Sequence, residues 1–179
     1  MKNLLVLALA IGLTGCAITQ PKPITYNLTS EFDSLSAQQQ LMPGDGSIRG
    51  TAFLRQQGGG IVTCAGQLVH LIPVTDYASE RMQIIYPFTP KVGETSYKNF
   101  RDEMLVKRNF IPDEPDYREH TKTTKCDAQG EFLFENLKDG QYYIQTAVTW
   151  QVQYSIQGGL LVSKAEVLNG KSPRIIMSQ

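Results

Sequence analysis

The chain has 179 residues, of which 41% are hydrophobic and 19% charged, and this composition indicates a globular protein of about one domain rather than a disordered one. Lysine plus arginine equals aspartate plus glutamate at 17 each, so the formal net charge is zero. Because there is also no basic run and no nucleic-acid motif, we expect no nucleic-acid partner.

Residues 1–15 have the pattern of a bacterial secretion signal. The apolar run over residues 4–13 is too short for a membrane-spanning helix, which needs about 20 residues. It leads into Leu13-Thr14-Gly15-Cys16, which resembles the bacterial lipobox. The resemblance implies that Cys16 becomes the acylated first residue and anchors the protein in the membrane. Ala17 favours the outer membrane, with the periplasmic or surface side left open; an ordinary secretory peptide is the alternative.

Residues 16–47 differ in composition from the rest of the chain. They are rich in Gln, Ser, Pro and Gly and contain few clustered apolar residues. Such a segment is typical of a flexible tether that holds a domain away from a bilayer. Only residues 36–41 suggest a short helical turn.

Residues 48–179 have the pattern of a β-rich domain. In residues 141–154 large apolar side chains alternate with polar ones, which predicts a long strand with one buried face. Gly-rich pairs, such as Gly158-Gly159, separate the shorter apolar runs and predict turns. Short strands at this spacing are typical of a β-sandwich. The other expected strands cover residues 48–55, 60–64, 67–72, about 131–134, 160–168 and 174–177.

Residues 121–150 also carry a family resemblance. They are similar to the signature of carboxypeptidase regulatory-like domains, which are transthyretin-like (prealbumin-like) Greek-key β-sandwiches. This resemblance implies a non-catalytic folding, binding or spacer module rather than a peptidase. The similarity is carried by Asp127-Ala128-Gln129-Gly130, Asn136-Leu137 and Asp139-Gly140-Gln141-Tyr142-Tyr143, and earlier by residues 50–53 and 69–73.

A long insertion, at about residues 75–120, departs from that family pattern. Ala78, Met82, Ile85 and Tyr86 recur at helical spacing behind a cap at Thr75 or Asp76. Tyr97, Phe100 and Met104 repeat the spacing, so two short helices are expected. The insertion is rich in aromatic residues, which either pack it onto the sandwich or present a surface to a ligand or partner. This candidate binding surface consists of Tyr77, Tyr86, Phe88, Tyr97, Phe100, Phe110 and Tyr117.

Two cysteines remain once Cys16 is acylated, Cys64 and Cys126. Both lie at ends of expected strands in a chain bound for an oxidising compartment, so we expect them to form a disulfide. The competing interpretation is a nucleophilic Cys64 assisted by His70. An extended strand would place these two residues about 20 Å apart, which favours the disulfide.

The sequence contains no spacing typical of a metal site or a serine hydrolase. His70 is expected on a strand and His120 in a loop, and the acidic residues 113–119 indicate a solvated turn rather than a calcium loop. We therefore expect no catalytic residues, no metal and no cofactor. The expected function is a lipid-anchored envelope protein that presents a non-catalytic module to another envelope component. The alternatives are an accessory lipoprotein of a secretion machine, such as a type VI system, and a hydrolase.

Overall fold

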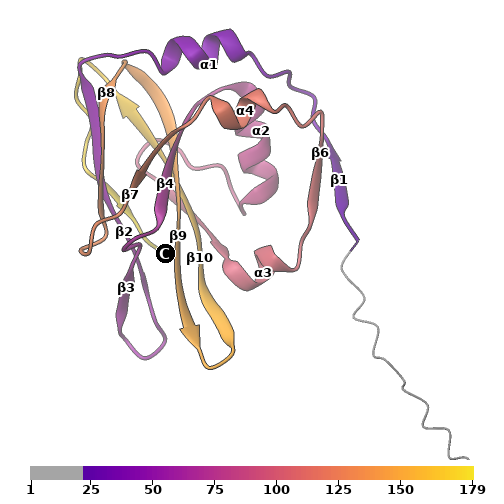
Figure 1. Ribbon diagram of the computed structural model, residues 1–179, viewed down its shortest axis with the longest axis vertical. Helices are drawn as coiled ribbons and strands as arrows, with labels where there is room; N and C mark the ends of the chain where they lie inside the picture. Colours follow the sequence, from indigo (N-terminus) through magenta and orange to yellow (C-terminus); the bar gives the residue numbers. More distant parts are fainter. Residues whose placement is uncertain (1–21) are drawn as a thin grey trace, which may run out of the picture.

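The computed structural model describes residues 22–179. The expected signal peptide and Cys16 therefore lie outside the described residues. The described chain forms two facing β-sheets, with a partly helical insertion packed on the outer side of one of them (Figure 1). The prediction of a mainly β sandwich with a helical insertion is confirmed.

The larger sheet has five strands in the order β5-β10-β9-β4-β7, and all neighbours are antiparallel. Its centre is the long hairpin of β9 and β10, which turns at Gln153 and Tyr154. The predicted break at Gly158-Gly159 is wrong, because both glycines lie within β10. The strands are β4 (Leu68–Pro73), β5 (Thr95–Asn99), β7 (Lys122–Lys125), β9 (Gly140–Val152) and β10 (Ser155–Val167).

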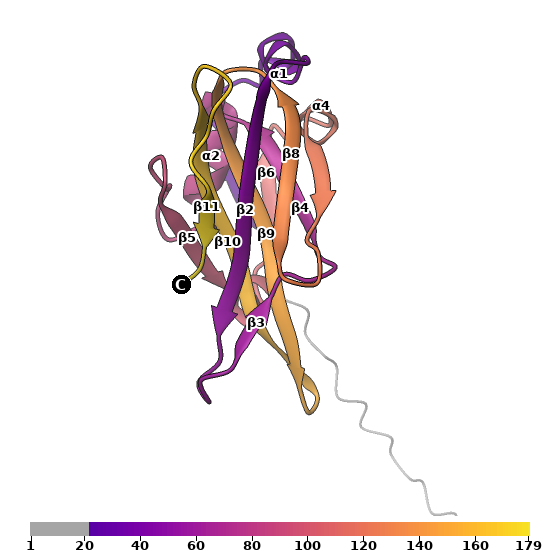
Figure 2. The same ribbon diagram turned by 90° about the vertical axis from the view of Figure 1, so that its left-hand side faces the viewer.

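The smaller sheet is built around β2 (Gly46–Arg55) and faces the larger sheet (Figure 2). On one side β2 pairs in parallel with β11 (Ile175–Met177). On its other side it pairs first with β8 (Glu131–Leu137) and then with β3 (Ile61–Thr63), both antiparallel. The main hydrophobic core fills the space between the two sheets and includes Ile144 and Val148 of β9, as the alternation in the sequence predicts.

A disulfide between Cys64 and Cys126 links the chain after β3 to the chain after β7. The two Cα atoms are 5.7 Å apart, within the usual range for such a bridge. Both cysteines are buried in the main core. The predicted disulfide is confirmed, and a bonded Cys64 has no thiol to act as a nucleophile.

The insertion begins with α2 (Asp76–Ile85), where Thr75 caps the helix by accepting a hydrogen bond from the amide of Ala78. This first helix is as predicted. The second prediction holds only from residue 100 on, because Tyr97 lies in β5 and α3 spans Phe100–Met104. As a strand, residues 95–99 form backbone hydrogen bonds with the open edge of β10, and these replace the internal hydrogen bonds that a helix would have formed. The insertion ends with β6 (Arg108–Ile111) and α4 (Asp116–Glu119).

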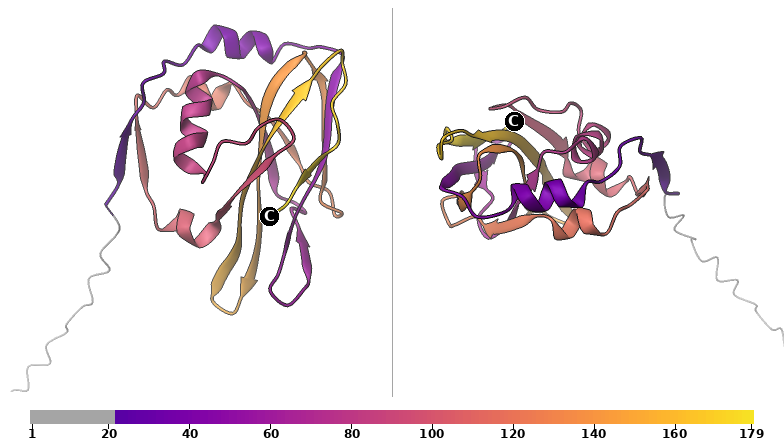
Figure 3. Two further views of the ribbon diagram at one scale, coloured as in Figure 1. Left: turned by 180° about the vertical axis from the view of Figure 1, so that it is seen from behind. Right: turned by 90° about the horizontal axis from the view of Figure 1, so that it is seen from above.

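The segment before β2 is also part of the folded unit. Strand β1 (Ile24–Asn27) pairs in parallel with β6, and α1 (Ser34–Gln40) lies across the top of the sandwich (Figures 1 and 3). Of the described residues 22–179, no helix combines the length and the apolar character that crossing a membrane requires.

Specific hydrogen bonds hold this N-terminal segment in place. The Glu80 carboxylate accepts the amides of Thr29 and Ser30 at 2.9 Å each, and these bonds lower its pKa. At the other end of the segment, Gln40 donates to the hydroxyl of Tyr142 at 2.8 Å. The prediction of a flexible tether over residues 16–47 is therefore wrong for residues 24–47. Composition did not reveal these bonds, since their partners lie 50 or more residues away.

Candidate functional site

The β2–β3 and β9–β10 hairpins project from the same end of the sandwich (Figures 1 and 2). A hollow of about 520 Å³ is lined by residues of both hairpins, of β5 and α3, and by Gln179. This volume lies within the range of small-molecule sites. Leu54 of β2 is buried at its base. We refer to this space as the end hollow.

Two aromatic rings line the end hollow, Trp150 on β9 and Tyr97 on β5. Trp150 is the single tryptophan of the chain. It has the same strand parity as Val148, so its ring points between the sheets, and both aromatic rings pack partly against the main core. Each ring is thus half-buried, which leaves part of its surface free to contact a ligand.

Two adjacent glycines of β10 make room for these rings. Gly158 has a positive φ of 104°, and a Cβ atom added there would overlap with the carbonyl oxygen of Val148 and lie 3.0 Å from the ring of Trp150. A Cβ atom added at Gly159 would overlap with the ring of Tyr97. The glycine pair that suggested a turn in the sequence instead allows two aromatic rings to lie close to the strand backbone.

Hydrogen bonds fix the ring of Tyr97 and the residues beside it. The Tyr97 hydroxyl donates to the carbonyl oxygen of Gly158 at 3.1 Å. Asn99 donates to the same hydroxyl at 3.4 Å, and its side-chain oxygen accepts the amide of Arg101 at 2.9 Å. Burial raises the pKa of Tyr97, so the phenol stays protonated and remains a donor at neutral pH. The remaining polar side chains at the end hollow come from Arg55, Gln57, Arg101, Ser155, Gln157 and Gln179.

A second hollow, of about 540 Å³, lies on the outer face of the larger sheet beside His70, Lys125 and Gln145. Among the described residues, none that lines it is a Phe, Tyr or Trp. Burial lowers the pKa of His70, which lies on β4 as expected from the sequence. This second hollow has polar groups but no aromatic ring in its lining, so the end hollow is the better candidate for a binding site.

Most residues of the candidate aromatic surface on the insertion are buried and therefore not available to a ligand or partner. Four of the seven residues are buried in a second hydrophobic cluster between α2 and the outer face of β9, so they pack the insertion onto the sheet. Hydrogen bonds from Tyr143 to Ser79 and from Gln145 to the Tyr86 hydroxyl support that packing. Of the seven, the buried residues are Tyr77, Tyr86, Phe110 and Tyr117, while Phe88 is exposed, Phe100 is half-buried and Tyr97 lines the end hollow.

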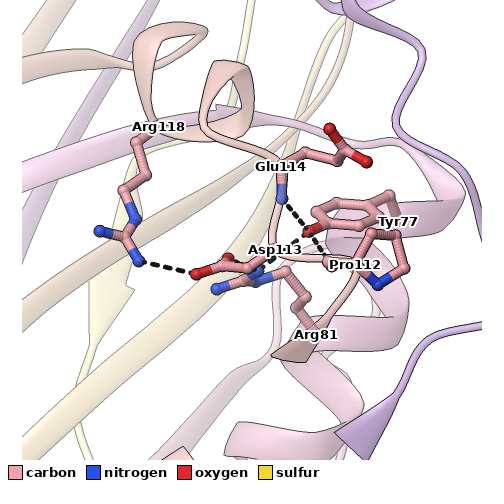
Figure 4. A network of polar contacts seen from close by, with 6 residues as sticks. All are labelled: Tyr77, Arg81, Pro112, Asp113, Glu114 and Arg118. Atoms are coloured by element: carbon pink, nitrogen blue, oxygen red, sulfur yellow. Dashed lines mark hydrogen bonds and ion pairs between the residues drawn. The ribbon is translucent and has the colours of Figure 1, made fainter. Parts of the chain in front are cut away.

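A buried arginine organises this second cluster (Figure 4). The Arg81 guanidinium lies 4.0 Å from the ring centre of Phe110 and donates to the Asp113 carboxylate at 2.6 Å and to the Tyr77 hydroxyl at 3.0 Å. Asp113 also pairs with Arg118 at 3.2 Å. The acidic turn therefore includes one carboxylate that anchors the insertion, a role the sequence did not suggest. Within residues 22–179, no three His, Cys, Asp or Glu side chains lie close enough together to hold a metal ion.

Comparisons with known proteins identify a similar fold only. No protein-family model matches the chain, and no match is found among curated proteins. Among solved structures, the chain is similar to the crystal structure of a "putative carbohydrate binding protein" from Pseudomonas aeruginosa, with 20% sequence identity and a TM-score of 0.64. The similarity covers 84% of this chain and 99% of that one. At this level of identity it concerns the arrangement of the strands.

Proposed function

We propose that this protein is a lipid-anchored envelope protein whose β-sandwich is a non-catalytic carbohydrate-binding module, with the end hollow as its binding site. The observation that carries the proposal is the pair of half-buried rings, Trp150 and Tyr97, in one hollow with amide side chains around them. Sites for small molecules combine apolar or aromatic walls with a few polar groups that fix orientation.

A sugar ring matches such a lining chemically. Its C–H bonds form an apolar face that packs on the electron-rich face of an aromatic ring, while its hydroxyl groups point outward around the rim. Each hydroxyl can donate one hydrogen bond and accept others. Gln57, Asn99 and Gln157 carry amides with both functions, and they lie at the same hollow as the two rings.

A binding role without catalysis is consistent with the lining. Hydrolysis of a glycosidic bond generally uses a pair of carboxyl groups as acid and base or nucleophile. Among the described residues, no Asp, Glu, His or Cys side chain lines the end hollow. The similar Pseudomonas aeruginosa structure is also that of a proposed binding protein, and its ligand class supports ours.

The single tryptophan allows a direct test of the site. We would titrate the full chain, solubilised in a detergent without a sugar headgroup, with a panel of oligosaccharides and record the emission of Trp150. Saturable changes in this emission are expected for at least one saccharide, with the affinity confirmed by calorimetry. If no saccharide in the panel produced a saturable change or heat of binding, the proposal would be wrong.

Two variants separate the site from the rest of the surface. Trp150→Ala removes the larger ring and should weaken saccharide binding at least about tenfold, as is typical when a central aromatic contact is lost. Phe88→Ala is the matched control, because Phe88 is an exposed aromatic residue of the insertion that does not line the end hollow. Calorimetry serves for both variants, since Trp150→Ala also removes the fluorophore.

The membrane anchor in this proposal is Cys16, on the strength of the lipobox-like Leu13-Thr14-Gly15-Cys16. Several acyl chains would hold the protein stably at a bilayer, and Ala17 favours the outer membrane. Cells grown with radiolabelled palmitate should label the wild-type protein but not Cys16→Ala. Label that persisted in the variant would refute this anchor.

A further inference from the structure

We propose that the saccharide bound at the end hollow carries an anionic group, a carboxylate, phosphate or sulfate, which Arg55 and Arg101 hold while the sugar ring lies on the aromatic surface. This inference rests on the proposed carbohydrate-binding function and specifies its ligand class. Arginine has a planar set of donors that fits both carboxylate and phosphate oxygens in pairs.

The two arginines enter the end hollow from different parts of the fold. Arg55 is the last residue of β2 in the smaller sheet, and Arg101 lies in the first turn of α3, directly after the edge strand of the larger sheet. An anion between them would be contacted from both layers of the sandwich. Asn99 fixes the backbone of Arg101 by accepting its amide at 2.9 Å.

Arg55 and Arg101 differ from most arginines of the described chain, because they form no ion pair. Within residues 22–179, four arginines form ion pairs with carboxylates: Arg81, Arg108, Arg118 and Arg174. The arginines outside these pairs are Arg49, Arg55 and Arg101, and the last two line the end hollow. The chain as a whole has no net charge, so the positive charge here is local.

Within the described chain, the carboxyl groups near these arginines do not pair with them. Asp102 follows Arg101 in α3, and its negative charge contributes to the raised pKa of Tyr97 after burial, the main cause. Its side chain does not line the end hollow, and the neighbouring Glu103 is paired with Arg108 at 2.6 Å. The last residue of the sequence, Gln179, also lines the hollow, and neither its carboxylate nor that of Asp102 forms an ion pair with Arg55 or Arg101.

The test compares matched neutral and anionic sugars on the full chain, in a zwitterionic detergent without a sugar headgroup. The probes are a neutral hexose trisaccharide, the corresponding hexuronate trisaccharide, a hexose phosphate, a hexose sulfate and inorganic phosphate. We expect at least one anionic sugar to bind about tenfold more tightly than its neutral counterpart at 20 mM salt, and the advantage to shrink at 500 mM salt because exposed charges are screened. The anionic sugar that binds most tightly identifies the type of charged group.

Arginine variants connect this preference to the site. Arg55→Gln and Arg101→Gln should each weaken binding of the anionic sugar about fivefold and leave the neutral sugar unchanged. Arg49→Gln is the matched control, because Arg49 is also an exposed arginine of β2 but does not line the end hollow and lies about 20 Å along the strand from Arg55. It should change neither affinity.

The outcomes distinguish this inference from the function on which it rests. Equal affinity for neutral and anionic sugars, or arginine variants that leave the anionic sugar unaffected, would overturn the anionic preference while carbohydrate binding stands. Inorganic phosphate that bound as tightly as the hexose phosphate would reduce the site to an ion site and also overturn the inference. If neither class of sugar bound, the proposed function itself would fail.

Discussion

Replacing Asp113 by alanine removes the partner of a cation that is buried in the insertion. The side chain of Arg81 is only 8% exposed, and its carboxylate partner is 41% exposed. Breaking a fully buried ion pair typically costs about 3–5 kcal/mol, because the remaining charge stays buried without compensation. Here solvent screens part of the pair, and Arg81 keeps its bond to Tyr77 and its contact with Phe110. We therefore expect Asp113→Ala to lower the free energy of unfolding by about 2 kcal/mol.

Replacing the other partner of the ion pair, Arg81, should lower the free energy of unfolding by less. In Arg81→Met an unbranched apolar side chain fills a similar volume against the rings of Phe110 and Tyr117. Asp113, left behind, still has Arg118 at 3.2 Å and contact with water. The expected loss is about 0.5–1 kcal/mol, and adding Asp113→Ala to Arg81→Met should change little further.

Urea unfolding of the two single variants and the double variant measures this asymmetry. Circular dichroism and the emission of Trp150 should give coincident transitions if the insertion unfolds together with the sandwich. The reasoning would be refuted if Arg81→Met cost more than Asp113→Ala, or if the two losses simply added. Either result would show that Arg81 does not depend on Asp113 as its counter-charge.

Three further changes test other parts of the structure. Replacing Cys64 and Cys126 by serine should lower the free energy of unfolding in urea by about 4 kcal/mol, given the separation of 62 residues, and a loss below 1 kcal/mol would contradict that role. Gly158→Ala should destabilise the protein and weaken saccharide binding, whereas Gly58→Ala, where a Cβ meets open space, should do neither; calorimetry and urea unfolding measure both. Burial lowers the pKa of His70 below its usual 6.5, so the unfolded chain binds a proton before the folded one does and stability falls as the pH drops below about 7. His70→Gln should flatten the fall in Tm between pH 7.5 and 5.5, and an unchanged slope would refute this assignment.

The sandwich could be predicted because its signals are local. Alternation along residues 141–152 marks a strand with one buried face, and the period of two needs no knowledge of distant residues. The same holds for α2, whose helical spacing is visible in the sequence; the sequence leaves the cap open between Thr75 and Asp76, and the structure has Thr75. These features predicted the two-layer fold and the first helix of the insertion.

The candidate site depended on contacts that sequence does not show. The alternation over residues 141–154 predicts only that Trp150 is a strand residue on the buried face, and the helical spacing predicts a helix at Tyr97, which lies in β5. They line one hollow because residues 95–99 form a strand that pairs with β10 instead of a helix. The paired residues are about 60 positions apart in the sequence. The signals available were that Trp150 is the single tryptophan and lies near the end of a long strand. The same long-range limit explains why Arg81 was not recognised as the centre of the second cluster.

The end hollow follows from a difference in strand length between the two layers. The central strands β9 and β10 have 13 residues each, whereas β8 has 7 and β11 has 3. β8 and β11 pair with β2 no further than Ala52, so beyond it the smaller sheet consists only of β2 and β3 and leaves the end that carries Trp150 partly open. Half-exposed aromatic rings at such a place contribute less to stability than fully buried ones. The two glycines that make room for them also lower the stability of the fold, because glycine loses more conformational entropy on folding than other residues do. Arg55 and Arg101 lie at the same opening, and neither forms an ion pair within the described chain. A bound sugar with an anionic group would cover the aromatic rings with its ring and give the two arginines a negatively charged partner.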